Sequence, residues 1–280
     1  MTRPRFDAID IAAILAERAP DLARRLPPGT YALLRLVLHE RLLNALLTGY
    51  QSYGPGEFCE AVLDRLRVTV RIENRHYLEA ARRPVVCANH PSGGIEGLAL
   101  ILALSRTRGG CLFPGNDLLS LLPPLAPIIV PVDRGRPKRA HAAAFERAFA
   151  GDAPILVFPA GVTARVYAGV LREFPWAPTF VTRARRHSRD VLPVWVSGRN
   201  SRHFYLIHKL RRTFGVSINV EMTLLLDELL RRRGDRVTLR FGPPREVDHP
   251  AVDRDPRASD RRFAEQLRRE VEEPQRREQW

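Results

Sequence analysis

The chain has 280 residues, 45% of them hydrophobic, which suits one globular domain with a sizeable core. Lys and Arg number 45 against 31 Asp and Glu, and the formal net charge of +14 favours an anionic partner such as nucleic acid, anionic lipid or a phosphorylated carrier. The cysteines Cys59, Cys87 and Cys111 are far apart and lack C-x-x-C spacing, which argues against a disulfide framework or a zinc site. No signal-peptide pattern is visible, and no apolar run reaches the roughly 20 residues of a spanning helix.

The first part of the chain, residues 1–56, predicts an N-terminal helical segment. Residues 7–19 are typical of a short helix with Asp7 as its N-cap, and residues 30–48 of a long helix. The apolar face of the long helix is wider than contact with one core requires. Arg35 and Arg41 lie beside it, so this helix either rests on an anionic bilayer or packs on the rest of the chain, and the sequence leaves both open.

From residue 57 to residue 247 the pattern alternates between strands and helices. This alternation predicts an α/β fold with a mixed, largely parallel sheet flanked by helices. Residues 248–280 are highly charged and predict a C-terminal tail or helix, helical over 259–272. The expected strands are 68–72, 85–88, 128–132, 155–158, 191–197 and 237–241, and the expected helices 95–105, 137–150, 178–186 and 220–233.

The most informative segment is 85–97, an apolar strand that runs through Asn89 and His90 into a glycine turn and a helix. Open α/β sheets place their sites at such strand ends. Six helical steps would separate His90 from Glu96, but Gly93 and Gly94 allow the chain to fold back. A carboxylate can then orient a proton-accepting imidazole, with the nucleophile left to the substrate. The backbone N–H groups of the two glycines are candidates for oxyanion stabilisation. The alternative is a histidine that only caps or packs.

Three further strand ends carry polar or turn-forming residues, and together they predict one shared cleft. Arg134 follows the strand at 128–132. Phe158 ends the strand at 155–158 and is followed by Pro159, Gly161 and Arg165, and Asn200 follows the strand at 191–197. Each alone is typical of an ordinary strand-to-loop exit with a solvated side chain.

The order of these segments resembles the lysophospholipid acyltransferase superfamily, which includes the glycerol-phosphate and lysophosphatidic acid acyltransferases. Residues 89–97, Asn-His-Pro-Ser-Gly-Gly-Ile-Glu-Gly, are most similar to the N-H-P-x-G-G-x-D-G block of the bacterial hemolysin-like and lyso-ornithine-lipid O-acyltransferases. Residues 130–134, 157–165 and 193–201 are similar to the second, third and fourth blocks. The likeness covers residues 30–245.

The resemblance implies a glycerolphosphate acyltransferase-like fold and an O-acyltransferase that uses acyl-CoA or acyl carrier protein to acylate a lysolipid hydroxyl. His90 would be the general base and Glu96 would orient it. Arg134 and Arg165 would bind an anionic head group or the pantetheine phosphate, and Phe158 to Gly161 would shape the acceptor pocket. The remaining substrate-binding candidates are Asn89, Gly93, Gly94 and Asn200.

No metal and no cofactor beyond the acyl donor are implied. The expected partners are the lysolipid acceptor, the acyl donor and an anionic membrane surface, with no specific nucleic acid. We expect a peripheral protein on the cytoplasmic side of the inner membrane. Nucleic-acid binding is suggested by charge alone, because the sequence lacks a recognisable binding module and aromatic residues interleaved on a basic surface.

The sequence departs from the family pattern in its acidic residues. Glu96 stands where the family has Asp. Ala160 replaces the usual third-block Glu, while Val162 and Ala164 replace the Glu and Ser of the Gly-Gly branch. An acceptor-binding carboxylate is therefore missing, which motivates a second hypothesis: a non-catalytic lipid- or acyl-chain-binding relative of the same fold.

Overall fold

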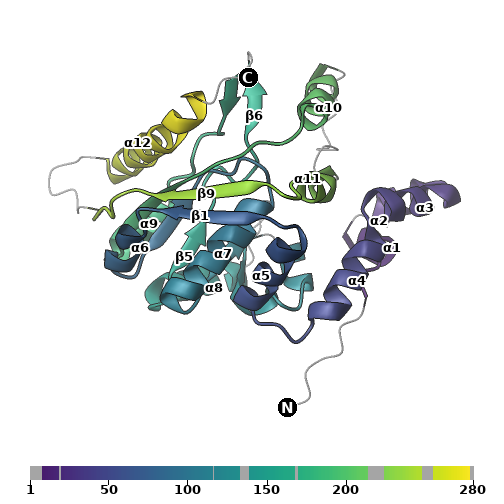
Figure 1. Cartoon of the computed structure of the whole chain (residues 1–280), viewed down its shortest axis with the longest axis horizontal. Coiled ribbons are helices and arrows are strands. Elements are labelled where there is room, and N and C mark those ends of the chain that lie inside the picture. The colour runs from purple at the N-terminus through teal and green to yellow at the C-terminus, as the bar shows by residue number, and fades with distance from the viewer. Residues whose placement is uncertain are drawn as a thin grey trace.

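A five-stranded sheet in the order β1-β9-β8-β2-β5 forms the centre of the molecule (Figure 1). The computed structural model describes residues 8–18, 20–115, 117–132, 139–167, 170–213, 224–247 and 255–277. Neighbouring strands are parallel except β8 and β9, which are antiparallel, so the predicted mixed, largely parallel sheet is confirmed. The strands are β1 (Thr69–Glu73), β2 (Val85–Ala88), β5 (Ile155–Val157), β8 (Val191–Val196) and β9 (Arg236–Phe241).

Two small sheets extend this centre. Strands β3 (Phe113–Gly115) and β4 (Ile129–Pro131) form a parallel pair, and a bridge from Leu112 to Ile155 joins the pair to β5. The strand predicted at 128–132 therefore lies outside the main sheet. Strands β6 (Arg165–Tyr167) and β7 (Val170–Arg172) form an antiparallel hairpin that the sequence pattern did not indicate.

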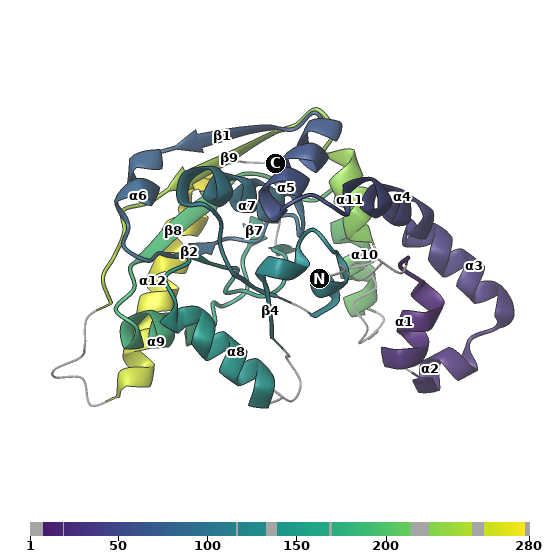
Figure 2. The same cartoon turned by 90° about the horizontal axis from the view of Figure 1, so that it is seen from below.

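Helices cover both faces of the sheet, because successive residues of each strand point to opposite sides. Val86 and Ala88 of β2 face one core, with the helices α5 (Pro55–Arg65) and α7 (Ile95–Arg108). Val85 and Cys87 face a second core, with α8 (Arg139–Ala150), α9 (Thr179–Arg186) and α12 (Pro256–Arg277) (Figure 2). All four residues of β2 are buried, as expected for a strand covered on both faces.

The remaining helices pack at the edges of this arrangement. Within the described residues, none of the helices combines the length and apolar character needed to cross a bilayer. The remaining helices are α1 (Ile11–Arg18), α2 (Pro20–Arg25), α3 (Pro28–Val37), α4 (Glu40–Tyr50), α6 (Arg75–Ala80), α10 (Arg202–Thr213) and α11 (Leu225–Arg231), with the short 3-10 turns η1 (Asp117–Leu121) and η2 (Ala126–Ile128).

The single helix predicted at 30–48 is wrong, because α3 ends at Val37 and α4 begins at Glu40. His39, between them, has a left-handed backbone with φ 51° and ψ 39°. Its Nε2 lies 2.8 Å from the Asp227 carboxylate on α11. The sequence gives no signal of this break, because no helix-breaking residue lies there. The break coincides instead with the tertiary contact between His39 and Asp227. The helices α1 to α4 extend to one side of the α/β body (Figure 1).

The chain termini also differ from the expected boundaries. Helix α1 starts at Ile11, and Asp10 accepts hydrogen bonds from the N–H groups of Ala12 and Ala13, which is the capping role predicted for Asp7. Asp7 lies outside the described residues. Helix α12 is longer than the predicted 259–272, and its Leu267 and Val271 are buried in the second core.

Candidate active site

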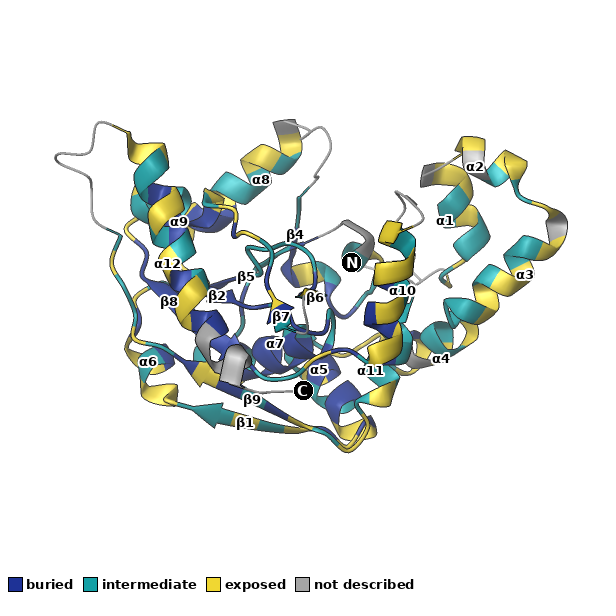
Figure 3. Ribbon diagram, turned by 90° about the horizontal axis from the view of Figure 1, so that it is seen from above, coloured by how far each residue is buried: buried dark blue, intermediate teal, exposed yellow. Residues whose placement is uncertain are grey.

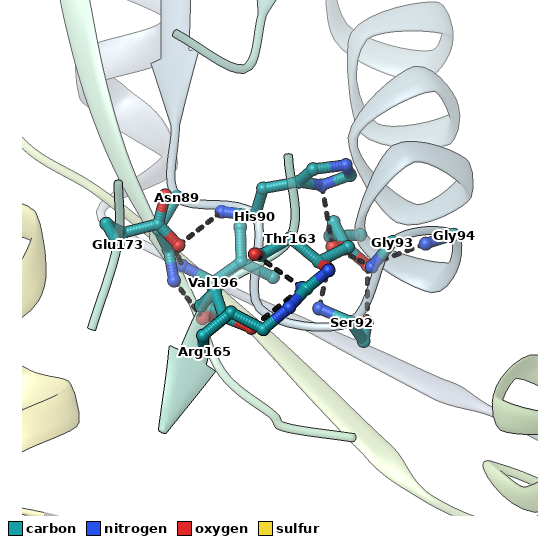
Figure 4. Close-up of polar contacts among 11 residues, drawn as sticks. Asn89, His90, Ser92, Gly93, Gly94, Thr163, Arg165, Glu173 and Val196 are labelled. Carbon is teal, nitrogen blue, oxygen red and sulfur yellow. Dashed lines mark hydrogen bonds and ion pairs between the residues drawn. The ribbon is translucent and has the colours of Figure 1, made fainter. Parts of the chain in front are cut away.

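The turn after β2 folds the chain back so that His90 meets Glu96 on the first turn of α7. His90 Nδ1 lies 2.9 Å from Glu96 Oε1 (Figure 4), close enough for a hydrogen bond although the ring is not aligned for a straight one. Gly93 makes the turn possible with a φ of +92°. A Cβ at Gly93 would also lie 2.6 Å from Thr163 Cγ2, so a side chain would collide there.

The Glu96 carboxylate is completely buried and organises the whole turn. Its oxygens accept the N–H groups of Ser92 at 2.9 Å, Gly93 at 2.6 Å and Gly94 at 3.2 Å, together with the Ser92 hydroxyl. Burial raises the pKa of Glu96, but the hydrogen bond and charge of His90 and the donors of Ser92 and Gly93 outweigh it, and the pKa falls to about 2. Glu96 is therefore a carboxylate at neutral pH.

These contacts bear on the role predicted for Gly93 and Gly94, which stays a prediction. Their N–H groups were expected to bind substrate by stabilising an oxyanion, but both are directed to the carboxylate of Glu96. The physical reason is that Gly93 and Gly94 precede α7, so their N–H groups have no partner within the helix. A carboxylate in the first turn satisfies them, so the turn holds the acid in place.

The main chain of His90 is fixed on both sides, and its ring is partly open to solvent. The N–H donates to Glu173 Oε1 at 2.9 Å, and the carbonyl accepts the Ala164 N–H at 2.8 Å. The ring stacks on Phe158, with centroids 4.4 Å apart and an interplanar angle of 24°. The side chain is 19% exposed. Because Nδ1 faces Glu96, Nε2 is the nitrogen left to meet a substrate hydroxyl.

Asn89 holds the sheet together at the end of β2. Its Nδ2 donates to the Val196 carbonyl at 2.8 Å, and its Oδ1 accepts the Val196 N–H at 2.6 Å (Figure 4). The residue has no exposed surface. The sequence predicted Asn89 to bind substrate, whereas the structure uses both ends of its amide to tie β2 to β8.

Arg165, which was predicted to bind an anionic head group, is also buried. It is 3% exposed, and its Nη1 donates to the carbonyls of Thr163 at 2.7 Å and Ala164 at 3.2 Å, as well as to the Thr163 hydroxyl. The guanidinium lies 4.9 Å from the centre of the Phe204 ring. This position stabilises the loop behind Gly93 and gives no support to direct contact with a head group.

The remaining candidates lie near the turn or outside the described residues. Gly161, with a φ of +66°, donates its N–H to the Phe158 carbonyl at 2.9 Å, and the Pro159 carbonyl accepts the Ala177 N–H at 3.1 Å. Asn200 is 3% exposed and donates its backbone N–H to the Tyr205 hydroxyl at 3.0 Å. Arg134 lies outside the described residues, so its predicted role stays a prediction.

Sequence reasoning missed one carboxyl group at the site, that of Glu173. It follows β7 and stands 83 residues from His90 in the chain. Neither a motif nor a periodic pattern marks it, since it comes from the unpredicted hairpin. Over the described ranges, no group of three or more His, Cys, Asp or Glu side chains is placed to hold a metal ion.

A buried carboxylate beside an imidazole at a strand end is an arrangement that can accept a proton from a hydroxyl group. The family model described as acyltransferase matches residues 13–268. The chain therefore belongs to the lysophospholipid acyltransferase superfamily, as its motif order predicted, and it is an acyltransferase.

Two relatives of the same description match most of the chain. It is 32% identical over 246 residues to a lyso-glycine lipid O-acyltransferase of Phocaeicola vulgatus, covering 87% of this chain and 88% of that protein. It is 31% identical to the protein of the same description from Bacteroides thetaiotaomicron, covering 87% and 90%. A crystal structure of PlsC, the 1-acyl-sn-glycerophosphate acyltransferase of Thermotoga maritima, aligns with a TM-score of 0.48 and 17% identity over 96% of this chain and 88% of that one.

Proposed function

We propose that this enzyme moves a fatty acyl group from acyl-CoA or acyl carrier protein to the hydroxyl of a lysolipid, with His90 as the general base. The observation that carries this proposal is the 2.9 Å contact between His90 Nδ1 and the buried Glu96 carboxylate. Nε2 takes the proton of the hydroxyl as its oxygen attacks the thioester carbonyl. The C–S bond then breaks, and the leaving thiolate takes the proton from the imidazolium. Glu96 stabilises the imidazolium throughout.

A lyso-aminolipid is the acceptor class that the relatives support. Both are described as lyso-glycine lipid O-acyltransferases and share about a third of their residues with this chain. Ala160 and Val162 stand at third-block positions where the family pattern has carboxylates. The residues expected to contact the acceptor therefore also differ from that pattern. Phe158 stacks on His90, which supports the proposal that it shapes the acceptor pocket.

The direct test offers radiolabelled palmitoyl-CoA and palmitoyl carrier protein in parallel to purified protein, with lyso-glycine lipid, lyso-ornithine lipid and lysophosphatidic acid as acceptors. We expect a diacyl product with at least one lysolipid, and lyso-glycine lipid to be acylated fastest. Mass spectrometry of the products identifies the new ester. Absence of product from every donor and acceptor pair would favour the non-catalytic lipid-binding relative instead.

We also propose that the enzyme works as a peripheral protein on an anionic bilayer, at the cytoplasmic face of the inner membrane. Helix α3 exposes Leu33 (58%) and Leu36 (72%), and α10 exposes Leu206 (52%) and Leu210 (46%). Both helices carry exposed residues along their length (Figure 3). Arg35 lies between the two exposed leucines of α3, while Lys209 and Arg211 lie beside Leu210 of α10, which contains no acidic residue. Exposed apolar side chains among cations favour an anionic lipid surface.

Helix α10 would bring that surface close to the reacting groups. On its other face, Phe204 and Tyr205 are buried together with Ala164, whose N–H holds the His90 carbonyl. A bilayer touching the outer face of α10 thus lies one helix away from the candidate base.

Vesicle co-sedimentation tests this surface. Replacing Leu206 and Leu210 by Asp removes apolar area and adds repulsion, so we expect binding to phosphatidylglycerol-containing vesicles to fall by about tenfold or more. The Leu121→Asp variant changes a leucine of similar exposure, 40%, on η1 and should bind like the wild type. Equal binding of the double variant and the control would rule out α10 as a contact surface.

A further inference from the structure

A second buried carboxyl group, that of Glu173, lies behind His90. Glu173 is 5% exposed and follows the β6–β7 hairpin. Its Oε1 accepts the main-chain N–H of His90 at 2.9 Å (Figure 4). The described β2 ladder ends at Ala88, so the His90 N–H lies beyond the hydrogen bonds of the sheet. The contact with Glu173 satisfies a donor that burial would otherwise leave unpaired.

The C-terminal helix holds Glu173 in turn. The Glu173 N–H donates to Glu272 Oε1 at 2.8 Å, and that residue of α12 is 2% exposed. Arg268 Nη1, one turn earlier on α12, donates to the same oxygen at 2.6 Å. A continuous chain of hydrogen bonds therefore runs from α12 through Glu173 to the main chain of His90.

Burying an ionisable carboxyl group at this position costs free energy. Burial, together with the nearby Glu272 carboxylate, outweighs the lowering effects of the His90 N–H, the His90 charge and Trp176, and raises the pKa of Glu173 to about 7. A neutral side chain would be easier to bury. Groups with such shifted pKa values gather at functional sites, which is consistent with a role in the reaction.

We propose that Glu173 is a positioning residue that fixes the main chain of His90, and that Glu272 anchors it from the C-terminal helix. This inference rests on the proposed role of His90 as the base. The Ala164 N–H fixes the His90 carbonyl, while Glu173 fixes its N–H. With both peptide groups held, Nε2 has a set distance to the acceptor hydroxyl, and a displacement of about 1 Å costs about 100-fold in rate.

The test compares Glu173→Ala, Glu173→Gln and Glu272→Ala in the acyl-transfer assay, with palmitoyl-CoA and lyso-glycine lipid. We expect Glu173→Ala to lower kcat by about 10- to 100-fold while KM for the acceptor stays within about twofold, because positioning acts on the transition state. The Gln variant keeps an oxygen for the same N–H and should restore most of kcat. Glu272→Ala should lower kcat in the same direction by a smaller factor.

A matched control and a melting experiment separate positioning from general structure. Glu270→Ala removes another carboxylate of α12, which pairs with Arg245 at 2.8 Å, and should leave kcat unchanged. The folded Glu173 carboxyl holds its proton to a higher pH than the unfolded one, so the fold loses stability as the pH rises from about 5 to about 7. The Gln variant should therefore melt above the wild type near pH 8, and this advantage should vanish near pH 5.

The outcomes distinguish the two proposals. An active His90→Ala variant would exclude His90 as the base, and the positioning role of Glu173 would be excluded with it. An inactive His90→Ala beside a Glu173→Ala variant with wild-type kcat, or with only KM raised, would overturn the positioning role alone. If Glu173→Ala does not fold, Glu272→Ala carries the kinetic test and the Gln variant the melting test. Unchanged kcat in Glu272→Ala with no pH-dependent melting difference would then overturn the inference.

Discussion

We expect His90→Ala to lower kcat for acyl transfer by about 100- to 10,000-fold, the usual contribution of a general base. The ring is the group held by the Glu96 carboxylate at 2.9 Å, and no proton acceptor remains there after truncation. The side chain is partly exposed, so the fold should survive its loss. Initial rates at saturating donor and acceptor, with the melting temperature measured in parallel, check this expectation.

The control for this experiment is another histidine. His76 is exposed on α6 and packs beside Tyr77, away from the turn that follows β2. The His76→Ala variant should turn over like the wild type. Turnover of the His90 variant within about threefold of the wild type would exclude the imidazole as the base.

The second large effect concerns Glu96, where we expect Glu96→Gln to lower both activity and stability. The carboxylate accepts N–H groups from Ser92, Gly93 and Gly94, and an amide presents an NH2 group to part of this ring of donors. Loss of the acid that orients the base lowers kcat by about 100- to 10,000-fold. The broken buried network lowers the free energy of unfolding by about 3 kcal/mol near neutral pH.

The stabilisation by Glu96 should change with pH in a direction that follows from its pKa. The pKa of Glu96 is lowered to about 2 in the folded state from its ordinary value of 4.5, so its stabilisation is present above about pH 5 and is lost as the pH falls towards about 2. Urea denaturation at several pH values should show the wild type and the variant converging over that range. Parallel curves would contradict the assigned role of the carboxylate.

An exposed glutamate at another helix start supplies the control. Glu57, in the first turn of α5, accepts the Gly54 N–H at 2.8 Å in a comparable capping contact. Glu57→Gln should cost less than about 1 kcal/mol, because the contact is open to solvent, and should leave kcat unchanged.

The strand-end site could be predicted from the sequence because its parts lie within a few residues of one another. An apolar strand, two glycines and a helix start confine His90 and Glu96 to one turn, and the structure places them 2.9 Å apart. The donors around Glu96 could not be predicted from the sequence, because the N–H groups of Gly93 and Gly94 meet the carboxylate only in the folded turn. Spacing shows which residues can meet but not which hydrogen bonds they form.

The alternation of strands and helices can be read from the amino-acid order, as can the candidate base at a strand end and the acid beside it, because these follow from periodicity and turn chemistry over short stretches. Two contacts arise only on folding: His39 interrupts a helix beside Asp227, 188 residues away, and Glu173, 83 residues away, holds His90. Folding also buries Asn89 and Arg165. Burial and long-range pairing depend on which elements pack together, and no local pattern contains that information.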